Sequence, residues 1–500
     1  MSGGANFVAV DLGAASGRVF VGEWDGGKFH LEQLHRFSNS SVHAKDHLYW
    51  DVLRLWSEIK IGLRAYKQKF QQPALSVGVD AWGVDFALLD SAGHLVGNPC
   101  SYRDPRTSGV PAAVFAKIPE FECFQATGIR SMPINTLFQL FSMVQSGDPQ
   151  LEVAASLLML PDLLTYWLGG SKTTEYTAAS TSEMLAKETA EWAHELLTRL
   201  AIPRHILPAV TQPGFLVGTM QTEIVREIGF AEAPSLVSVA AHDTASAEAA
   251  IPNMDQDSVF LSTGTWNLMG VETKTRITSR EAMELKFSNE GGVDGSILLL
   301  RNITGFWLLQ ECVRQWERQG QSYQWQELLR LAEAAAPFRS LVDPDAAEFE
   351  CPENMLLAIR TFCRNSDQPE PELPGEFARC CLESISLRQR EVLECLEHLT
   401  QRRLSTIRMV GGGCHNHLFC HFTADATKRR VVAGPVEATV LGNVLVQAVA
   451  TGHVRDIQQG RDAVAESVEQ VSYEPQPGSN WDEALCKFKN LGARSLHSSG

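Results

Sequence analysis

The stretch VAVDLGAASGRVFVGEW, from Val8 to Trp24, sets two apolar runs on either side of a small polar turn. The runs Val8–Val10 and Val19–Gly22 are rich in β-branched residues, which favour strands, so the stretch predicts a β-hairpin early in the fold. Small residues are common in any hairpin turn, so a purely structural turn is the alternative at this stage.

The residues of this turn also suit a phosphate group. Its glycines let the backbone approach an anion, and backbone N–H groups and the Ser16 hydroxyl can donate hydrogen bonds to it. Arg18 adds a positive charge, which strengthens such bonds. Asp11, just before the turn, offers the hard oxygen ligand that suits Mg²⁺, which it would hold through water.

The same pattern returns in the second half of the chain. SVFLSTGTWNLMGVET, residues 258–273, again places a Gly/Thr turn between two apolar runs. The repeat predicts two related α/β halves, with a boundary near residue 250 and a cleft between them, a usual place for ligands. Two such hairpins could hold a triphosphate from both sides.

Three further segments have clear patterns. Residues 52–70 predict a helix, residues 75–90 a strand, a polar turn and a second strand, and residues 404–427 a strand, a glycine turn and a helix. In the second segment, Trp82 beside Gly83 and carboxylates suits a sugar, whose apolar face could stack on the indole ring. The alternative is that Trp82 is an ordinary core residue.

The segment AAHDTASA contains the best catalytic candidate, Asp243. It follows an apolar strand and precedes a predicted helix, a position where side chains often meet ligands. A carboxylate there could accept a proton from an alcohol that attacks phosphorus. Asp is also a preferred helix N-cap, and the residues alone leave both interpretations open.

Composition narrows the class of protein. The formal charge of the 500 residues is 43 − 59 = −16, which disfavours nucleic-acid binding. No run of about 18 uncharged apolar residues and no signal segment is evident, so a membrane protein is not expected. Eleven scattered cysteines, with Cys380 and Cys381 adjacent, suit reduced thiols in the cytoplasm.

Taken together, the motifs resemble the FGGY carbohydrate kinases, within the actin/hexokinase/Hsp70 group of ATP-dependent folds. The similarity spans about residues 8–443, in family order, and is closest to kinases of L-rhamnulose. The stretches that carry it are AVDLGAASGR, DAWGVDFALLD, YRDPRT, AAHDTASA, LSTGTWNLMG, NEGG, RNITGFWLLQ, VGGGCHN and TADAT…VVAGPVEATVLGN.

The resemblance implies two RNase H-like, actin-like ATPase domains with a deep interdomain cleft. Residues 1–249 would form the N-terminal kinase domain and residues 250–490 the C-terminal one, and residues 491–500 a disordered tail. With Mg²⁺, the enzyme would transfer the γ-phosphoryl group of ATP to O1 of L-rhamnulose. The products would be L-rhamnulose 1-phosphate and ADP, in the degradation of L-rhamnose.

The resemblance also implies roles for single residues. Asp243 matches the catalytic base, and Asp11 matches the metal-associated Asp of the superfamily. The residues that match ATP contacts are Ala14, Ala15, Ser16, Gly17, Arg18, Thr265, Gln310, Gly411 and Gly412. The residues that match sugar contacts are Gly83, His242, Asp243, Thr244 and Asn302. Because the implied substrate is a deoxy sugar, the apolar side chains of Trp82 and Phe86 could meet its C6 methyl group.

A second class of function uses the same nucleotide site. An ATP-driven binding or assembly protein, of the actin or chaperone kind, would have the two hairpins but would not phosphorylate a small molecule. The polar set of Trp82, Gly83, His242 and Asn302 favours the kinase, as does the lack of a separate peptide-binding domain. The expected partners are ATP and a ketose, in a cytoplasmic monomer or weak homo-oligomer.

Overall fold

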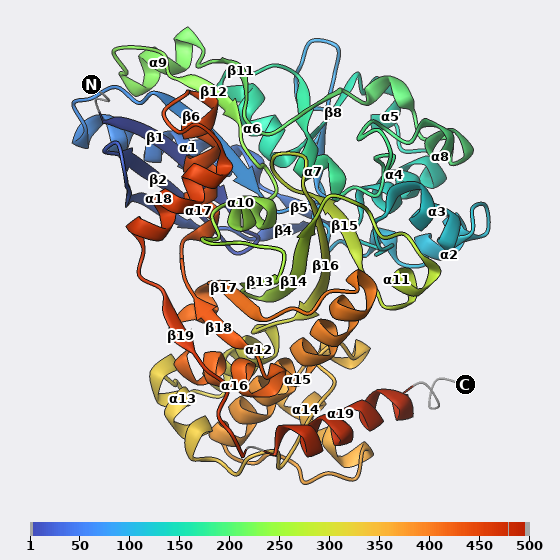
Figure 1. Cartoon of the computed structure of the whole chain (residues 1–500). Coiled ribbons are helices and arrows are strands. Elements are labelled where there is room, and N and C mark those ends of the chain that lie inside the picture. The colour runs from blue at the N-terminus through green and yellow to red at the C-terminus, as the bar shows by residue number, and fades with distance from the viewer. Residues whose placement is uncertain (1–3, 479, 496–500) are drawn as a thin grey trace. The chain divides into compact units, whose positions relative to one another are not determined.

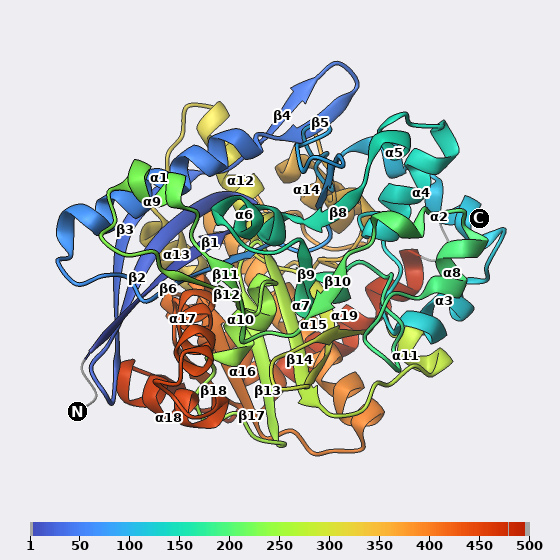
Figure 2. The ribbon, with the colours of Figure 1, turned by 90° about the horizontal axis from the view of Figure 1, so that it is seen from above.

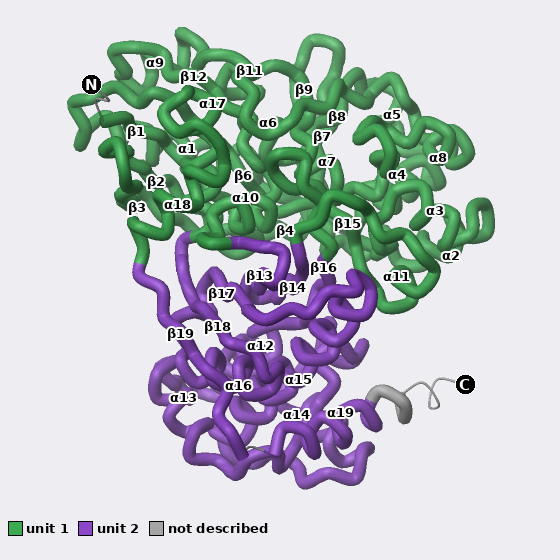
Figure 3. Tube along the Cα trace, in the orientation of Figure 1, with its two compact units in different colours: residues 1–253, 272–299, 438–468 green, residues 254–271, 300–437, 469–500 purple. Residues whose placement is uncertain are grey.

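A computed structural model describes residues 4–478 and 480–495 (Figure 1). The chain divides into two compact units (Figure 3). Unit 1 comprises Met1–Asn253, Glu272–Leu299 and Ala438–Val468, and unit 2 comprises Met254–Val271, Leu300–Glu437 and Glu469–Gly500. The first division lies close to the predicted boundary near residue 250. The predicted domains of 1–249 and 250–490 differ from these units, because two later segments belong to unit 1.

The main sheet of unit 1 has six strands in the order β11-β12-β6-β1-β2-β3. Its strands are β1 (Ala5–Leu12), β2 (Ser16–Trp24), β3 (Phe29–Ser38), β6 (Ser76–Ala81), β11 (Phe215–Thr219) and β12 (Ser235–Ser238). The first three strands are antiparallel neighbours, whereas β6 runs parallel to both β1 and β12. The predicted first hairpin is therefore confirmed as β1 and β2.

Further strands of unit 1 form two-stranded pairs or lie apart from this sheet. These are β4 (Ser41–Ala44), β5 (His47–Trp50), β7 (Phe86–Leu89), β8 (Ser156–Met159), β9 (Thr173–Glu175), β10 (Ala209–Thr211) and β15 (Ser288–Gly291). The helices of unit 1 are α1 (Val52–Lys69), α2 (Val110–Phe115), α3 (Glu120–Thr127), α4 (Thr136–Ser146), α5 (Gln150–Val153), α6 (Leu160–Leu168), α7 (Tyr176–Ser180), α8 (His194–Arg199), α9 (Thr222–Ile228), α10 (Asp243–Ala249), α11 (Arg280–Glu284), α17 (Ala438–Ala450) and α18 (Ile457–Ser467).

Strand β1 is buried on both faces because helices cover both sides of the sheet (Figure 2). Successive side chains of a strand point to opposite faces. Val8 and Val10 accordingly pack into one apolar cluster with residues of α1 and α6. Phe7 and Ala9 pack into another cluster, with residues of α17 and α18. Burial on both faces explains the continuous apolar run of the sequence.

Helix α17 belongs to unit 1 because polar side chains as well as apolar ones attach it to the sheet. The Gln447 side chain donates to the Val8 carbonyl (3.0 Å) and accepts from the Ser76 hydroxyl (2.7 Å). Asn443 donates to the Asp80 carboxylate (2.6 Å). Buried polar groups need such partners, so α17 is not easily moved from this face.

Unit 2 repeats the strand order of unit 1. Its sheet contains β16 (Ile297–Thr304), β14 (Trp266–Thr273), β13 (Ser258–Thr263), β17 (Thr406–Gly411), β18 (Arg430–Ala433) and β19 (Val471–Tyr473), in this order. As in unit 1, the first strand of the hairpin pairs with a later parallel strand, here β17, and β17 pairs with parallel β18. The order β16-β14-β13-β17-β18 thus matches β3-β2-β1-β6-β12, which confirms the predicted repeat.

The helices of unit 2 are α12 (Trp307–Arg318), α13 (Trp325–Ala334), α14 (Met355–Asn365), α15 (Pro374–Thr400), α16 (His417–Thr427) and α19 (Trp481–Ser495). Helix α15 packs on α13 and α16. The first five residues of the predicted tail, 491–495, are helical in α19, and residues 496–500 lie outside the described residues. None of the described helices is long and apolar enough to cross a membrane.

Gly442 is the contact point of α17 and α10. A Cβ atom at this position would lie 1.7 Å from the Ser246 carbonyl oxygen, so Gly442→Ala must push the two helices apart. We expect a loss of about 1–3 kcal/mol in the free energy of unfolding, measured by urea denaturation. Gly27→Ala is the matched control, since only a side-chain oxygen at 3.8 Å lies near its Cβ position. Equal stability of the two variants would contradict the tight contact.

Candidate active site

The turn of the first hairpin is held in shape by backbone hydrogen bonds. The Gly13 N–H donates to the Ser16 carbonyl (2.8 Å). Asn39 donates two further hydrogen bonds to this turn. Its backbone N–H donates to the Ala15 carbonyl (2.9 Å), and its side chain donates to the Gly13 carbonyl (2.9 Å). Hydrogen bonds therefore fix the conformation of the turn, including Ala14, that the sequence predicts to contact phosphate.

The sequence predicts that Arg18 contacts phosphate, and in the structure its side chain is paired with a carboxylate. It stands opposite Asp11 in the register of β1 and β2, and its guanidinium group is hydrogen-bonded to the Asp11 carboxylate. The same group lies over the Phe20 ring, 5.6 Å from the centroid. Any phosphate that reaches this hairpin would thus meet an arginine that already neutralises a neighbouring carboxylate.

Asp11 and Asp80 lie side by side at the carboxyl ends of β1 and β6. Asp80 is fully buried, and its pKa is raised well above its usual range by burial and by the neighbouring charge of Asp11. Its Oδ2 accepts from Asn443, whereas its Oδ1 is buried with no hydrogen-bond partner in the described structure.

These carboxylates fit a hydrated cation better than a directly bound one. No three His, Cys, Asp or Glu side chains among residues 4–478 and 480–495 come together closely enough to hold a metal ion. Mg²⁺ retains several waters when proteins bind it, usually through one or two carboxylates. Asp11, with the unsatisfied oxygen of Asp80 beside it, therefore fits a water-mediated Mg²⁺ site.

The loop after β12 brings His242 and Asp243 to the same edge of the sheet. The Ala81 N–H donates to the Ala241 carbonyl (2.9 Å), which continues the pairing of β6 beyond the strand itself. His242 is 7% exposed, and its Nε2 lies 3.4 Å from Oδ1 of Asp243. Asp243 is the first residue of α10 rather than its N-cap, so the capping alternative does not explain it.

The Asp243 carboxylate is partly exposed and has polar neighbours. Its side chain is 34% exposed, and the Thr244 hydroxyl donates to Oδ1 (3.3 Å). Displacement of water by the surrounding protein raises the pKa of Asp243, and the neighbouring His242 opposes this rise. A carboxylate whose pKa lies above its usual value is a better proton acceptor than an ordinary Asp.

Glu175 stabilises the His242–Asp243 loop, and the sequence did not predict this role. Its Oε2 accepts from the N–H groups of Ala178 (3.0 Å) and Ala241 (3.1 Å) and from the Thr177 hydroxyl (2.5 Å). The Thr177 oxygen in turn accepts from the N–H of His242 (3.0 Å). Burial raises the pKa of Glu175 to about 7. The contacts join residues about 65 positions apart, which no local pattern reveals.

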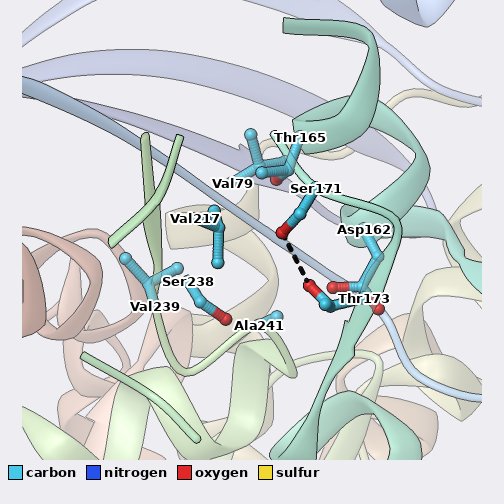
Figure 4. A pocket seen from close by; sticks show the side chains of 9 residues that line it. All are labelled: Val79, Asp162, Thr165, Ser171, Thr173, Val217, Ser238, Val239 and Ala241. Atoms are coloured by element: carbon cyan, nitrogen blue, oxygen red, sulfur yellow. Dashed lines mark hydrogen bonds between the residues drawn. The ribbon is translucent and has the colours of Figure 1, made fainter. Parts of the chain in front are cut away.

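A small cavity lies behind the loop, next to Ala241 (Figure 4). Its volume is about 10 Å³, roughly the space for one water molecule. It is lined by Val79, Asp162, Thr165, Ser171, Thr173, Val217, Ser238, Val239 and Ala241. Burial raises the pKa of Asp162 to about 8, and this carboxylate accepts from the N–H of Glu175 (3.1 Å). The cavity is too small for a sugar.

Gly83 lies at the end of β6, close to Thr181. A Cβ atom at Gly83 would meet the Thr181 side chain at 2.8 Å, and the Thr181 hydroxyl accepts from the N–H of Val84 (2.9 Å). Val84 has a φ of 67°, in the left-handed region that branched residues rarely adopt. Strain of this kind is most often found at functional sites.

The two apolar residues expected to meet a methyl group are buried instead. Trp82 is 6% exposed and Phe86 5% exposed. Trp82 packs against Trp50 with ring centroids 4.4 Å apart, and both indoles donate to Asp85 (3.0 and 2.6 Å). Trp82 is therefore a core residue oriented by a buried carboxylate, which supports the structural alternative.

In unit 2, the second hairpin places Thr265 beside Gln310. The Thr265 hydroxyl donates to Oε1 of Gln310 (3.3 Å), so two residues predicted to contact the nucleotide lie together. The Thr265 and Gly264 carbonyls accept from the N–H groups of Gly305 (3.1 Å) and Phe306 (3.0 Å). The turn of the hairpin is thereby fixed against the start of α12.

The glycine turn after β17 joins the same hairpin through Thr263. The Thr263 hydroxyl donates to the Val410 carbonyl (2.6 Å) and accepts from the N–H of Gly413 (3.0 Å). Gly411 has a φ of 85°, and a Cβ there would lie 2.6 Å from the Thr263 carbonyl oxygen. At Gly412 a Cβ would meet nothing within 4 Å, so this position is open to a ligand.

Asn302 is the one predicted sugar contact in unit 2. It lies in β16 and is half-buried. The other predicted sugar contacts, Gly83 and residues 242–244, belong to unit 1, where the sheet edge brings them together.

Known proteins are similar to this chain in sequence and in fold. Residues 6–249 and 259–451 match the N- and C-terminal domains of the FGGY family of carbohydrate kinases. The rhamnulokinase of Bacteroides thetaiotaomicron is 42% identical over 97% of this chain and 99% of its own length. The rhamnulokinase of Pectobacterium carotovorum is 40% identical, with coverage of 97% and 96%. The alternative of an assembly protein finds no support among these relatives.

Solved structures agree in fold. A xylulose kinase from Rhodospirillum rubrum has a TM-score of 0.80 at 15% identity, over 99% of both chains. A glycerol kinase from Plasmodium falciparum, solved with ADP, has a TM-score of 0.76 at 15% identity and covers 99% of this chain and 98% of its own. The matches to both family domains and the identity to whole-length relatives establish that the chain belongs to the FGGY family of carbohydrate kinases.

Proposed function

We propose that the protein transfers the γ-phosphoryl group of ATP to O1 of L-rhamnulose, in the degradation of L-rhamnose. The observation that carries this proposal is the His242–Asp243 loop, which is locked at the sheet edge while the Asp243 carboxylate stays a third exposed. Family membership supports a sugar kinase, and the rhamnulokinase relatives support the choice of sugar.

In the proposed reaction Asp243 accepts the proton of the O1 hydroxyl. The O1–phosphorus bond forms as the bond between the γ-phosphorus and the bridging oxygen breaks, and ADP leaves with that electron pair. Such a transfer depends on positioning and charge stabilisation rather than on covalent help from the protein. The sugar-contacting residues would be Gly83, His242, Thr244 and Asn302.

The nucleotide would be held by residues of both hairpins. In unit 1 these are Ala14, Ala15, Ser16, Gly17 and Arg18, and in unit 2 they are Thr265, Gln310, Gly411 and Gly412. Mg²⁺, when bound, supplies charge neutralisation for the phosphate oxygens, and Asp11 would hold it through water. Domains 1–249 and 250–490, as the sequence divides them, would then each contribute one hairpin, in a cytoplasmic enzyme that is a monomer or weak homo-oligomer.

Replacement of Asp243 tests its role. Asp243→Asn keeps the shape of the side chain but cannot accept a proton, so kcat should fall by about 10²- to 10⁴-fold. ATP affinity, measured by isothermal titration calorimetry, should stay nearly unchanged. The exposed Asp257→Asn is the control and should keep full activity. Near-wild-type turnover of the Asp243 variant would remove this residue from the mechanism.

A panel of ketoses tests the substrate. ADP release should rise most with L-rhamnulose, compared with L-fuculose and L-xylulose, because the rhamnulokinase relatives support this sugar. One small group in a binding pocket changes kcat/KM by about 10- to 200-fold, so we expect a preference of this size. A coupled ADP assay measures the rate, and ³¹P NMR identifies the 1-phosphate. ATP hydrolysis that is indifferent to every ketose would contradict the kinase and favour an assembly protein.

A further inference from the structure

Glu290 faces the catalytic loop from β15, and no role has been assigned to it so far. It is 8% exposed, and its Oε2 lies 3.3 Å from Nδ1 of His242. Both atoms are buried, and neither has a hydrogen-bond partner in the described part of the chain. The two unsatisfied atoms therefore face each other at a distance that a small rotation converts into a hydrogen bond.

The backbone on both sides of Glu290 is fixed. The Asn289 N–H and side chain both donate to the Gly128 carbonyl (2.9 Å each). The Gly291 N–H donates to the Ser180 hydroxyl (2.8 Å). Neighbouring side chains of a strand point to opposite faces, so these bonds also fix the side from which Glu290 projects. The carboxylate is placed at His242 by the fold.

Two other buried carboxylates of unit 1, those of Glu175 and Glu183, are satisfied in a different way. Glu175 accepts several backbone and hydroxyl donors, and Glu183 accepts from the side chains of Ser131 and Asn135 (2.9 Å for Asn135). These groups stabilise loops. Oε2 of Glu290 faces the His242 imidazole and has no hydrogen-bond partner among the described residues, and an unsatisfied buried carboxylate is costly. This contrast argues against a purely structural role for Glu290.

The imidazole of His242 lies between two carboxylates. Glu290 faces Nδ1, and Asp243 faces Nε2 at 3.4 Å. A hydrogen bond at one ring nitrogen fixes the orientation of the ring and the role of the other nitrogen. With Nδ1–H directed to Glu290, Nε2 is the nitrogen directed to the Asp243 side, where the sugar is expected.

We propose that Glu290 is a positioning residue, which accepts the Nδ1–H of His242 and so fixes the imidazole beside the catalytic carboxylate and the sugar hydroxyls. This inference rests on the proposed function in one respect, namely that Asp243 and His242 meet the sugar. The contact between Glu290 and His242 itself does not depend on the identity of the substrate.

The charges around the ring fit this arrangement. Burial lowers the pKa of His242, but Glu290, Asp243 and Glu175 raise it, and the net direction is upward. A group whose pKa is raised in this way keeps its proton to higher pH than free histidine. Removal of the Glu290 charge should therefore lower the pKa of His242. Asp243, in contrast, feels both the cation of His242 and the anion of Glu290, which act in opposite directions.

The first test is an NMR titration of His242 in the full chain without ligands. Glu290→Gln keeps the size of the side chain but removes its charge, so the pKa of His242 should fall below its wild-type value. His242→Gln assigns the resonance by its loss. The control is Glu284→Gln, an exposed residue of the same segment, which should leave the titration unchanged. An unchanged His242 titration in Glu290→Gln would overturn the proposal.

The second test is a double-mutant cycle on turnover. Glu290→Gln should lower kcat by about 10- to 100-fold with the KM for ATP unchanged, the range seen when a partner that orients a functional histidine is removed. In the His242→Gln background the same change should cost little, because Glu290 acts through His242. Full additivity of the two losses would contradict the proposal. If Glu290→Gln does not fold, Glu290→Asp takes its place and should shift the titration partially.

The outcome of the titration can be distinguished from the outcome of the proposed function. The titration requires no sugar and no nucleotide, so it can succeed even if L-rhamnulose is not the substrate. If the ketose assay fails and the titration succeeds, the pairing of Glu290 with His242 stands and only the reaction is wrong. If the titration fails and the ketose assay succeeds, the enzyme is a kinase in which Glu290 has no positioning role.

Discussion

The site depends on the parallel alignment of β1, β6 and the segment that follows β12. Pairing of β6 with β1 sets Asp80 beside Asp11, and its extension through the Ala81–Ala241 hydrogen bond places His242 next in line. Parallel strands end at a common edge, and residues just beyond that edge are displayed together. Three segments that are far apart in the sequence thus deliver their polar residues to one place through backbone bonds alone.

This arrangement concentrates negative charge in a poorly hydrated place, and the structure counteracts it in several ways. Arg18 pairs with Asp11, Asn443 donates to Asp80, and backbone N–H groups surround Glu175. A buried carboxylate without such partners would be destabilising or would take up a proton. Helix α17 supplies Asn443 and also packs on α10, the helix that begins with Asp243. One helix from late in the chain therefore supports both the charge balance and the His242–Asp243 loop.

Much of the fold follows from local sequence. The helix at 52–70, the two strands within 75–90 and both hairpins are confirmed with small differences at their ends, because apolar periodicity and glycine turns determine them. The division into compact units could not be derived in this way. Residues 438–468 lie within the second half of the sequence, but they pack against β1, β6 and α10 of unit 1. Long-range packing, rather than local pattern, decides where such a segment belongs.

The site shows the same limit at the level of single residues. Asp243 is a candidate from the sequence because it lies between a strand and a helix, although helix capping explains an Asp at such a position equally well. Glu290 lies in the NEGG stretch that carries the family resemblance, but the sequence predicts no role for it or for Glu175. The role of each becomes visible only when its partner is known, and His242 lies 48 residues before Glu290 and 67 after Glu175. A sequence does not show whether a buried Asp or Glu is structural or functional, because the residue type is the same in both cases. The partners of the acid distinguish the two cases. Here Glu175 accepts several hydrogen bonds from N–H and hydroxyl groups, whereas Glu290 faces the His242 imidazole.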